Sequence, residues 1–414
     1  MMEKCRIGVV GLQRGMAYAQ NARLVDGLEV TAVCDFVKPY VDRAVSALGD
    51  GVKGFTDYDE FLDSGLFDTV VLCNFFHEHA PLAIKAMERG IDVLSETTPA
   101  ITMQECADLC RAVERTGRKY MLAENYPFFV TNLEMKRLYE TGKLGRVLYA
   151  EGEYVHPSRS EELNWLAPGL RHWRNWIPRT YYLTHSLAPL MYMTGERLVA
   201  VNAKTVQAPE LYRGTARRHA DAASIMMVET DSGAVFRITG CAAWAGHGNT
   251  YRLCCTKGSV ENIRGTNELF LHYNSWAMPE GESEYQRYTP SWPSNAELAA
   301  KAGHGGGDFW VMYHFGQYML HDIEPFFDVY NSVAMSAVAI LAQRSALEGG
   351  KEYRIPDFRS EEERKICDGD TASPMPDENL NVTLPISPFD YTPAEKDIEN
   401  ANADWKRMGV VEYN

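Results

Sequence analysis

The stretch that decides the fold is Arg6-Ile7-Gly8-Val9-Val10-Gly11-Leu12-Gln13-Arg14-Gly15, and a second apolar segment, 29–34, ends in Asp35. The pattern predicts a strand at 6–10, a glycine turn, a helix from about 16 to 25 and a second strand. Glycine lets a backbone approach a pyrophosphate, and a helix N-terminus offers free N–H groups. A carboxylate about 20 residues on accepts ribose hydroxyls. The unit therefore predicts a dinucleotide site, and Asp35 favours NAD because a carboxylate repels the 2′-phosphate of NADP.

The glycine pattern itself is degraded, since Gln13 stands where a second glycine is expected and Gly15 where a spacer is expected. A doubly wound domain without a nucleotide is the alternative, and there Asp35 would only end a strand. The strand, helix and acid all agree with a cofactor site. The predicted cofactor-binding residues of this unit are Gly11, Gln13, Arg14, Gly15 and Asp35.

Composition excludes several classes of protein. The 414 residues are 45% hydrophobic, enough for two or three domains, and the net charge of −15 argues against nucleic acid and anionic membrane partners. No apolar run approaches the roughly 18 residues that span a bilayer. The nine cysteines form no C-x-x-C pair, and residues 1–4 leave no room for a signal peptide. We therefore expect a cytoplasmic protein with reduced cysteines.

The chain up to residue 125 alternates strands with helices, which predicts a parallel sheet covered on both faces. Expected strands are 69–73, 92–95 and 119–124, and expected helices are 79–89 and 102–116. This range, 1–125, is the predicted Rossmann NAD-binding domain. The fold class is thus α/β in its N-terminal part.

After Asn125 the pattern changes to long β-branched and aromatic runs with hairpin turns at 231–233 and 256–258. An open, mainly antiparallel sheet follows, in an α+β domain at 126–350 that serves substrate binding and oligomerisation. The expected strands are 147–156, 198–206, 223–241, 251–263 and 268–273; the expected helices are 131–139, 308–319 and 329–347. The tail, 351–414, is predicted to pack back on the protein.

A dinucleotide half followed by an open sheet resembles the glucose–fructose oxidoreductase and inositol dehydrogenase family (Gfo/Idh/MocA), over most of residues 6 to about 350. The segment Val70-Val71-Leu72-Cys73-Asn74, with His77 and His79, looks like the nicotinamide-side loop of that family. Gly90-Ile91-Asp92-Val93-Leu94-Ser95-Glu96 looks like its next strand. The family usually continues with a catalytic lysine, but Thr97 stands here. The resemblance implies further cofactor-binding residues, namely Asn74, His77, His79, Glu96, Thr97 and Asn125.

Five downstream motifs occur in an order similar to that in the NAD-dependent glycosidases of glycoside hydrolase family 109, which also lack the lysine. They are Glu124-Asn125, Tyr154-x-His156, Trp173-Arg174, Tyr182-x-x-His185 and His304-Gly-Gly-Gly-Asp308. The resemblance implies catalytic roles for the tyrosines and histidines of this set. It implies substrate binding by Glu124, Trp173, Arg174 and Asp308.

What the resemblance implies is transient oxidation at sugar carbon 3, loss of the carbon 2 proton, departure of the carbon 1 substituent, water addition and re-reduction. Such chemistry needs a base for a carbon acid, and a tyrosinate needs a nearby cation or donor. Tyr182 and His185 would share one face of a helical turn, so Tyr182 is the expected base and His185 polarises the ketone or relays the carbon 3 hydroxyl proton. Tyr154 and His156 point the same way along a strand and form a second polar pair.

Each of these residues has a simpler structural reading. The Tyr182 and His185 pair is also typical of a packed helix face, and Asp308 of a helix cap. His304 lies in a glycine loop, from which it either reaches the substrate or only ends the loop. No metal site is predicted, because His77 and His79 lack a third ligand. The role of His247 stays unassigned. The three tryptophans Trp165, Trp173 and Trp176 either form a stacking platform for sugar rings or hold the loop in place.

Two rival functions stay open. A plain NAD(H)-dependent sugar, polyol or glycoside 3-dehydrogenase would use His185 in place of the missing lysine and would release net NADH. A non-catalytic sensor of NAD and sugar would also explain the eroded turn. In either case the resemblance implies a small-molecule sugar or glycoside partner. The resemblance also implies a homodimer or homotetramer, because the open sheet of that family usually buries its face in one, and the apolar runs 225–228 and 234–238 are compatible with this.

Overall fold

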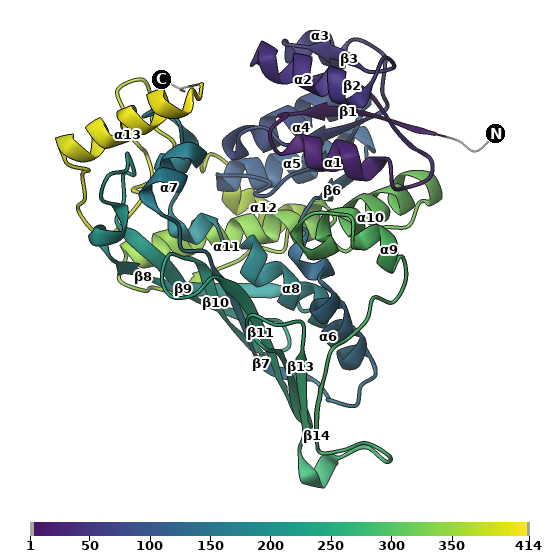
Figure 1. The fold of residues 1–414 in the computed structure, drawn as a ribbon. Helices are drawn as coiled ribbons and strands as arrows, with labels where there is room; N and C mark the ends of the chain where they lie inside the picture. Colours follow the sequence, from purple (N-terminus) through teal and green to yellow (C-terminus); the bar gives the residue numbers. More distant parts are fainter. Residues whose placement is uncertain (1–3, 412–414) are drawn as a thin grey trace. The chain divides into compact units, whose positions relative to one another are not determined.

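The computed structural model describes residues 4–411, which form two compact units (Figure 1). The first unit runs to Val130 and also includes Ser291–Ser336 and Phe358–Gly369. The second contains Thr131–Pro290, Ala337–Asp357 and the chain from Asp370 onward. These units differ from the contiguous ranges that the sequence suggested. The chain returns to the first unit at Ser291–Ser336, before the last strand of the second sheet, Tyr353–Arg354, and local patterns carry no sign of such a return.

The first unit is built on a six-stranded parallel sheet in the order β3-β2-β1-β4-β5-β6. Its strands are β1 (Cys5–Val10), β2 (Leu28–Cys34), β3 (Lys53–Phe55), β4 (Thr69–Leu72), β5 (Asp92–Ser95) and β6 (Tyr120–Leu122). Its helices are α1 (Gly15–Ala22), α2 (Lys38–Leu48), α3 (Tyr58–Leu62), α4 (His79–Glu88), α5 (Met103–Thr116), α9 (Ala296–Ala299), α10 (Gly307–His321), the start of α11 (Val329–Leu347) and α12 (Glu361–Arg364). The predicted Rossmann fold is confirmed.

Local chemistry fixes the ends of these elements. Helix α5 begins at a capping box, in which Thr102 accepts from the Glu105 backbone at 3.1 Å and the Glu105 carboxylate accepts from the Thr102 backbone at 3.3 Å. Strand β4 is wholly buried, as expected for a central parallel strand. Helix α1 ends at Ala22, three residues before the predicted end, and α10 packs on α1.

The second unit is built on a nine-stranded sheet in the order β14-β13-β12-β11-β7-β10-β9-β8-β15. Only β7 and β10 pair in parallel. Its strands are β7 (Val147–Val155), β8 (Leu198–Gln207), β9 (Asp221–Thr230), β10 (Val235–Ala242), β11 (Gly248–Cys255), β12 (Gly258–Asn262), β13 (Leu269–Tyr273), β14 (Tyr285–Tyr288) and β15 (Tyr353–Arg354). Its helices are α6 (Val130–Glu140), α7 (Ser160–Leu166), α8 (Thr184–Thr194), the end of α11 and α13 (Glu395–Met408). The predicted open, mainly antiparallel sheet and both hairpins are confirmed.

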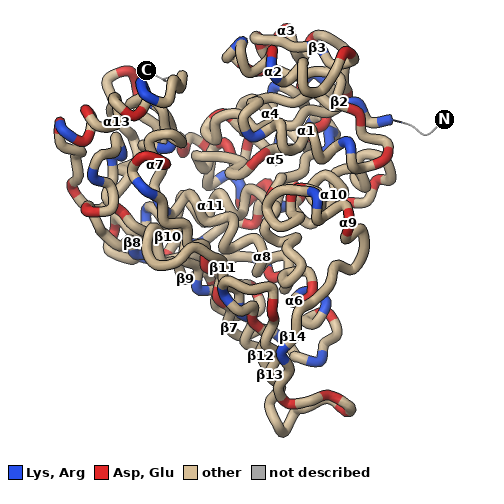
Figure 2. The backbone as a smooth tube through the Cα atoms, in the orientation of Figure 1, with Lys and Arg blue, Asp and Glu red and all other residues tan. Residues whose placement is uncertain are grey.

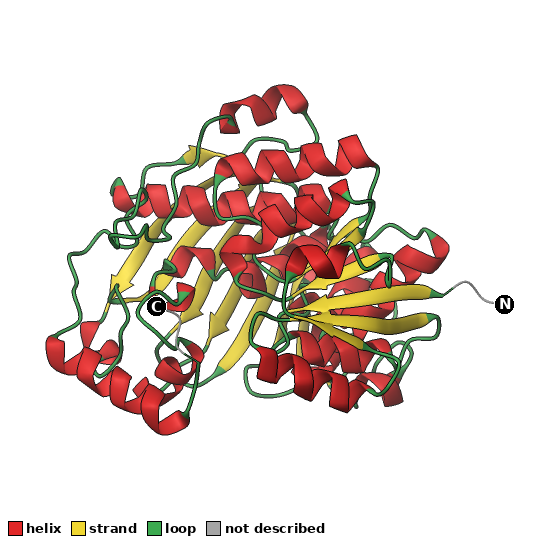
Figure 3. Ribbon diagram, turned by 90° about the horizontal axis from the view of Figure 1, so that it is seen from above, coloured by secondary structure: helices red, strands yellow, loops and turns green. Residues whose placement is uncertain are grey.

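The two faces of this sheet differ in chemistry. Along β7 the buried residues Ala150, Gly152 and Tyr154 alternate with Glu151 and Glu153. Helix α8 packs on β7, β10 and β11. In Figure 3 helices (red) lie across the strands (yellow) of the sheets. Both glutamates form ion pairs with Arg237 of β10. The period of two thus separates an apolar face from a charged face.

Charge is distributed evenly along the chain. Figure 2 shows Lys and Arg interspersed with Asp and Glu in both units. Across residues 4–411, no helix combines the length and the apolar character that crossing a bilayer requires. The tail, predicted only to pack back, contains the helix α13.

Candidate active site

The glycine turn of the first unit lies directly against the end of β4. Gly11 has φ +79°, and a Cβ there would lie 2.3 Å from the Cys73 carbonyl oxygen. Only glycine fits this position. The Asp35 carboxylate, 6% exposed, accepts from the backbone N–H groups of Leu12 (2.8 Å) and Val37 (2.9 Å), and burial raises its pKa. Asp35, which is predicted to bind the ribose, therefore also holds the turn in place.

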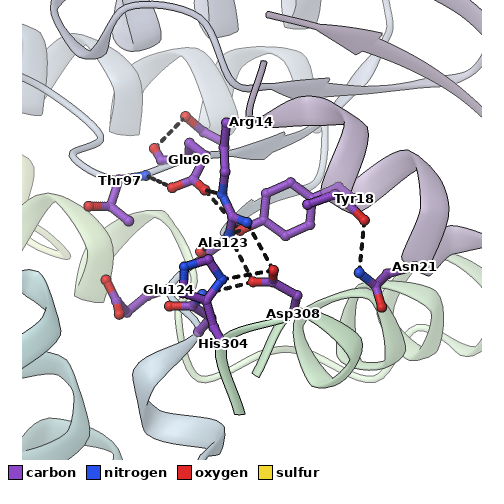
Figure 4. Close-up of polar contacts among 12 residues, drawn as sticks. Arg14, Tyr18, Asn21, Glu96, Thr97, Ala123, Glu124, His304 and Asp308 are labelled. Atoms are coloured by element: carbon purple, nitrogen blue, oxygen red, sulfur yellow. Dashed lines mark hydrogen bonds and ion pairs between the residues drawn. The ribbon is translucent and has the colours of Figure 1, made fainter. Parts of the chain in front are cut away.

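Arg14 of this turn is part of a buried charged network (Figure 4). Its guanidinium donates to Glu96 at 2.6 Å and to the two Asp308 oxygens at 2.9 and 2.8 Å. Asp308, 1% exposed, also accepts from Asn125 at 2.8 Å and lies 3.0 Å from Nδ1 of His304. The network joins the glycine turn, the end of β5, the segment after β6 and the start of α10.

The carboxylates of the network are charged because cations face them. Burial alone would raise the pKa of Glu96, but Arg14 lowers it below its usual value. Burial would likewise raise the pKa of Asp308, and hydrogen bonds from Arg14 and His304 lower it instead. Tyr18, on the same face of α1 as Arg14, donates to Glu96 and was missed from the sequence. Its spacing of four residues from Arg14 was the available signal.

Two polar atoms near the end of β4 have no partner in the described chain. They are Oδ1 of Asn74 and Nδ1 of His77, and burial lowers the pKa of His77 to about 4. Buried polar atoms are normally paired, so these two fit the polar groups of a bound cofactor. Together with the close-packed Gly11 turn and Asp35, they make the residues of this edge suitable for a dinucleotide.

Other predicted cofactor residues have different contacts. His79 is 1% exposed, and its ring nitrogens lie 2.9 Å from the Thr98 carbonyl and 3.3 Å from the Asn74 carbonyl, so it holds the loop in place, and its role toward the cofactor stays a prediction. The Gln13 side chain donates to the Tyr40 hydroxyl of α2 at 2.9 Å. The backbone of Thr97 donates to Glu96.

Three further predicted site residues also have contacts within the protein. Arg14 is held by the carboxylates of Glu96 and Asp308. Glu124 is fully buried and accepts from the Tyr126 backbone at 3.2 Å. Asp308, 1% exposed, supports Arg14 and lies within bonding distance of His304. Their roles toward cofactor and substrate stay predictions.

In the second unit, the rings of Tyr154, Tyr182 and His185 lie together. Tyr154 and Tyr182 stack at 5.9 Å between ring centroids. His185 meets Tyr154 edge-on at 5.0 Å and Tyr182 at 5.6 Å. Gly152 makes this possible, because a Cβ there would lie 2.0 Å from the Ser186 carbonyl oxygen. The start of α8 therefore rests directly on β7 and brings His185 to Tyr154.

Two histidines extend the cluster. His156 lies 5.7 Å from Tyr154, and the His247 ring meets the His156 ring at 4.8 Å. Burial and the neighbouring His247 lower the pKa of His156. The pairing of Gly248 with Val155 brings His247 beside His156. The sequence singled out His247 without a role, and it belongs to this cluster.

Arg174 supplies a cation to the ring cluster. Its guanidinium carbon lies 4.3 Å from the Trp173 ring centre and 6.0 Å from the Tyr182 ring centre. Trp176 is buried and its indole donates to the Leu170 carbonyl at 2.9 Å, so it anchors the loop, whereas Trp165 is exposed. Throughout residues 4–411, no group of three His, Cys, Asp or Glu residues is placed to hold a metal ion.

Three family models match consecutive ranges of the chain. The model described as oxidoreductase family, NAD-binding Rossmann fold, matches residues 5–124, and the GFO/IDH/MocA C-terminal domain matches residues 132–261. The glycosyl hydrolase 109 C-terminal domain matches residues 246–363. A Rossmann unit joined to an open-sheet unit defines a class of two-domain, NAD-binding proteins. The chain belongs to the Gfo/Idh/MocA family, and its first unit contains the NAD-binding Rossmann domain of that family.

Relatives and solved structures agree with this assignment. A glycosyl hydrolase family 109 protein 1 of Shewanella sp. (strain MR-7) is 27% identical over 403 residues, covering 86% of this chain and 85% of that protein. An alpha-N-acetylgalactosaminidase of Shewanella oneidensis is 26% identical over 403 residues, with 86% and 85% covered. The inositol dehydrogenase homolog of Azotobacter vinelandii, complexed with NADH and myo-inositol, has a TM-score of 0.66 at 18% identity. The alignment covers 85% of this chain and 98% of the Azotobacter vinelandii chain.

Proposed function

We propose that this protein is an NAD-dependent glycosidase that cleaves a glycosidic bond by transient oxidation at sugar carbon 3. The observation that carries the proposal is the convergence of Tyr154, Tyr182 and His185 in a chain with Thr97 at the position of the family lysine. The family models and the relatives support the coarser class, an NAD-dependent enzyme that acts on a sugar.

Bound NAD would supply the reversible oxidation that turns a sugar hydroxyl into a ketone and back. The residues of the Asp35 edge, with the unpaired atoms of Asn74 and His77, would hold it. The ketone acidifies the hydrogen on carbon 2, which needs a base. Tyr182 is the proposed base, and the Arg174 guanidinium, 6.0 Å from the Tyr182 ring centre, supplies the nearby cation that such a base needs.

The histidines move the remaining protons. His185, edge-on to both tyrosines, polarises the ketone or relays the carbon 3 hydroxyl proton. Tyr154 and His156 form the second polar pair at the sugar, and Trp173 offers a ring face for stacking. His304, held at Nδ1 by Asp308 with its side chain 47% exposed, is a further proton carrier. Elimination of the carbon 1 substituent and addition of water then complete hydrolysis, since the oxidation and the reduction cancel.

The test is a panel of chromogenic glycosides in both anomeric series, including the N-acetylgalactosaminides, followed for aglycone and NADH together. Release of many equivalents of aglycone per enzyme, without net NADH, is the expected result. NADH formed without aglycone would replace the proposal with the sugar 3-dehydrogenase. The absence of both signals, with NAD and sugar binding intact, would favour the sensor.

The oligomeric state stays a prediction. Met227 of β9 is 37% exposed on the sheet face opposite α8, and Ile225 lies on that same face. We infer a homodimer or homotetramer that covers this face. Light scattering at micromolar concentration tests it, and a monomer would contradict it.

A further inference from the structure

The C-terminal segment from Asp370 to Val410 packs against the loop that carries Trp173, Arg174 and Tyr182. The last of the three ranges matched by family models ends at residue 363, so this segment lies beyond all of them. Within the second unit, α13 lies beside α7, which opens that loop (Figure 1). The segment is attached to α7 and to this loop at three places.

The first attachment is at Asn164 of α7. The Trp405 indole, 1% exposed, donates to the Asn164 carbonyl at 2.9 Å, and the Asn164 amide donates to Asp404 at 2.9 Å. Trp405 packs with Ala216 and Ala401 in a small buried cluster that also meets Leu170. One turn of α13 therefore fixes α7 by both hydrogen bonds and apolar burial.

The second attachment lies two residues before Trp173. The Arg171 guanidinium donates to the backbone carbonyls of Asp377 (3.1 Å) and Glu378 (2.5 Å). The guanidinium reaches both carbonyls at once, so these bonds depend on the backbone conformation of residues 377–378. The bonds therefore tie the position of the loop to the path of the tail.

The third attachment is next to Tyr182. Gln343 of α11, fully buried, accepts from the Thr180 hydroxyl at 3.0 Å and donates to the Pro385 carbonyl at 2.9 Å. Two residues on, the Ser387 hydroxyl donates to Asp221 at 2.8 Å. The tail thus reaches, through one buried amide, the turn that sets the Tyr182 ring beside Tyr154.

We propose that residues 370–410 act as a strap that positions the loop carrying Trp173, Arg174 and Tyr182 for sugar binding. The anchors at Arg171 and Thr180 lie on either side of Trp173 and Arg174, Thr180 lies two residues before Tyr182, and Asn164 fixes the helix that precedes the loop. Fixing both ends of an irregular loop removes conformations that the bound state would otherwise have to exclude. The strap residues are positioning residues, and this role rests on the proposed function only where it concerns the sugar.

The test compares Trp405→Ala with Trp405→Phe, which keeps most of the ring volume but loses the indole N–H. Lys396→Ala, at an exposed position of α13, is the matched control. Hydrogen exchange resolved by peptide should show residues 160–182 exchanging about 10-fold faster in Trp405→Ala, with Trp405→Phe in between. Amides 5–124 and the affinity for NAD should not change.

Kinetics add a second readout. In Trp405→Ala the KM for the sugar should rise about 10-fold and kcat should also fall, because the loop carries both the sugar-binding residues Trp173 and Arg174 and the proposed base Tyr182. If Trp405→Ala does not fold, Arg171→Ala replaces it, since Arg171 lies at the surface and leaves the apolar cluster intact. The same changes in exchange and KM are expected there.

The strap is wrong if α13 loses protection while residues 160–182 exchange as in the wild type. This outcome is separate from failure of the proposed function. Exchange needs no turnover, so a loosened loop in a protein that cleaves no glycoside would keep the strap and reject the glycosidase. Glycoside turnover by the wild type, together with unchanged exchange of residues 160–182 in Trp405→Ala, would keep the glycosidase and reject the strap.

Discussion

The first unit holds its polar site residues by buried ion pairs, whereas the second holds them by contacts between rings. Asp308 accepts hydrogen bonds from Arg14 and Asn125 and lies within bonding distance of His304. Tyr154 and Tyr182 instead meet each other and His185 through their ring faces and edges. The two arrangements suit different tasks.

A charged network fixes geometry, because each carboxylate loses much of its stabilisation if a partner moves. In the second unit, the ring contacts set the positions of Tyr154, Tyr182 and His185, whose side chains are the proposed proton carriers. Under the proposed function, the Arg14 network of the first unit positions the cofactor, and the ring cluster of the second unit transfers protons. Changes made in the network or in the cluster should then affect mainly the task of that group.

The largest effect is expected from Tyr182→Phe, which keeps the ring stack and removes only the hydroxyl. The turnover number should fall by about 10³-fold, as is usual when a proton-transfer group is lost. Binding of NAD, measured by titration calorimetry, should not change. Tyr149→Phe is the control, because that hydroxyl bonds Glu151 on the opposite sheet face. Turnover retained within about 2-fold would remove Tyr182 from the mechanism.

The next effect is expected from Asp308→Asn. The amide neither balances Arg14 nor accepts all of the bonds that the carboxylate receives, so Arg14 would face Glu96 alone. Breaking a buried pair typically costs about 3 kcal/mol of folding free energy. Urea unfolding followed by peptide-resolved exchange should place this loss in the first unit. Asp370→Asn, which breaks the more exposed pair with Arg344 in the second unit, is the matched control. An equal loss of unfolding free energy in the two variants would show that the Asp308 network stabilises the protein no more than the Arg344–Asp370 pair does.

Local patterns in the sequence predicted much of this. The glycine turn, the acid at Asp35, the cap at Thr102 and the bounds of α11 follow from periodicity and turn chemistry, which lie within a few residues. The ring pairs Tyr154–His156 and Tyr182–His185 were predicted for the same reason. Helix α13 was missed although Ile398, Ala401 and Trp405 form an apolar stripe at helical spacing.

Contacts between distant residues were beyond such patterns. Arg14 and Asp308 are separated by 294 residues, and no local signal links them. The same applies to the pairing that sets His247 beside His156. His79 was assigned to the cofactor because its neighbours suggested it. Which way a ring faces depends on packing that forms only in the fold.

A smaller effect concerns pH. His314 of the first unit is buried against Phe128, with ring centroids 4.8 Å apart, and burial lowers its pKa to about 4. Its folded pKa lies below the unfolded value near 6.5. Its contribution to stability is therefore present above pH 6.5 and is lost as the pH falls toward 4.

His314→Phe should reduce the fall in unfolding free energy between pH 7 and pH 4.5 by about 2 kcal/mol. Urea titrations at the two pH values measure this difference directly. His272→Phe, in the second unit and partly exposed, should leave the difference unchanged. An unaltered pH dependence in His314→Phe would mean that other groups govern acid unfolding of the first unit.

The smallest effect separates the two roles of Asp35, which holds the glycine turn and faces the ribose position. Asparagine lacks one of the two acceptor oxygens, so either Leu12 or Val37 loses its bond. We expect Asp35→Asn to weaken NAD binding about 10-fold, near 1.4 kcal/mol, and NADP binding less, because the repulsion of the 2′-phosphate is removed. Asp42→Asn, at an exposed position of α2, controls for net charge. If NAD and NADP weaken equally, Asp35 acts only through the turn. If the ratio of NAD affinity to NADP affinity falls while the turnover number stays unchanged, Asp35 governs the choice of cofactor and not catalysis by the ring cluster.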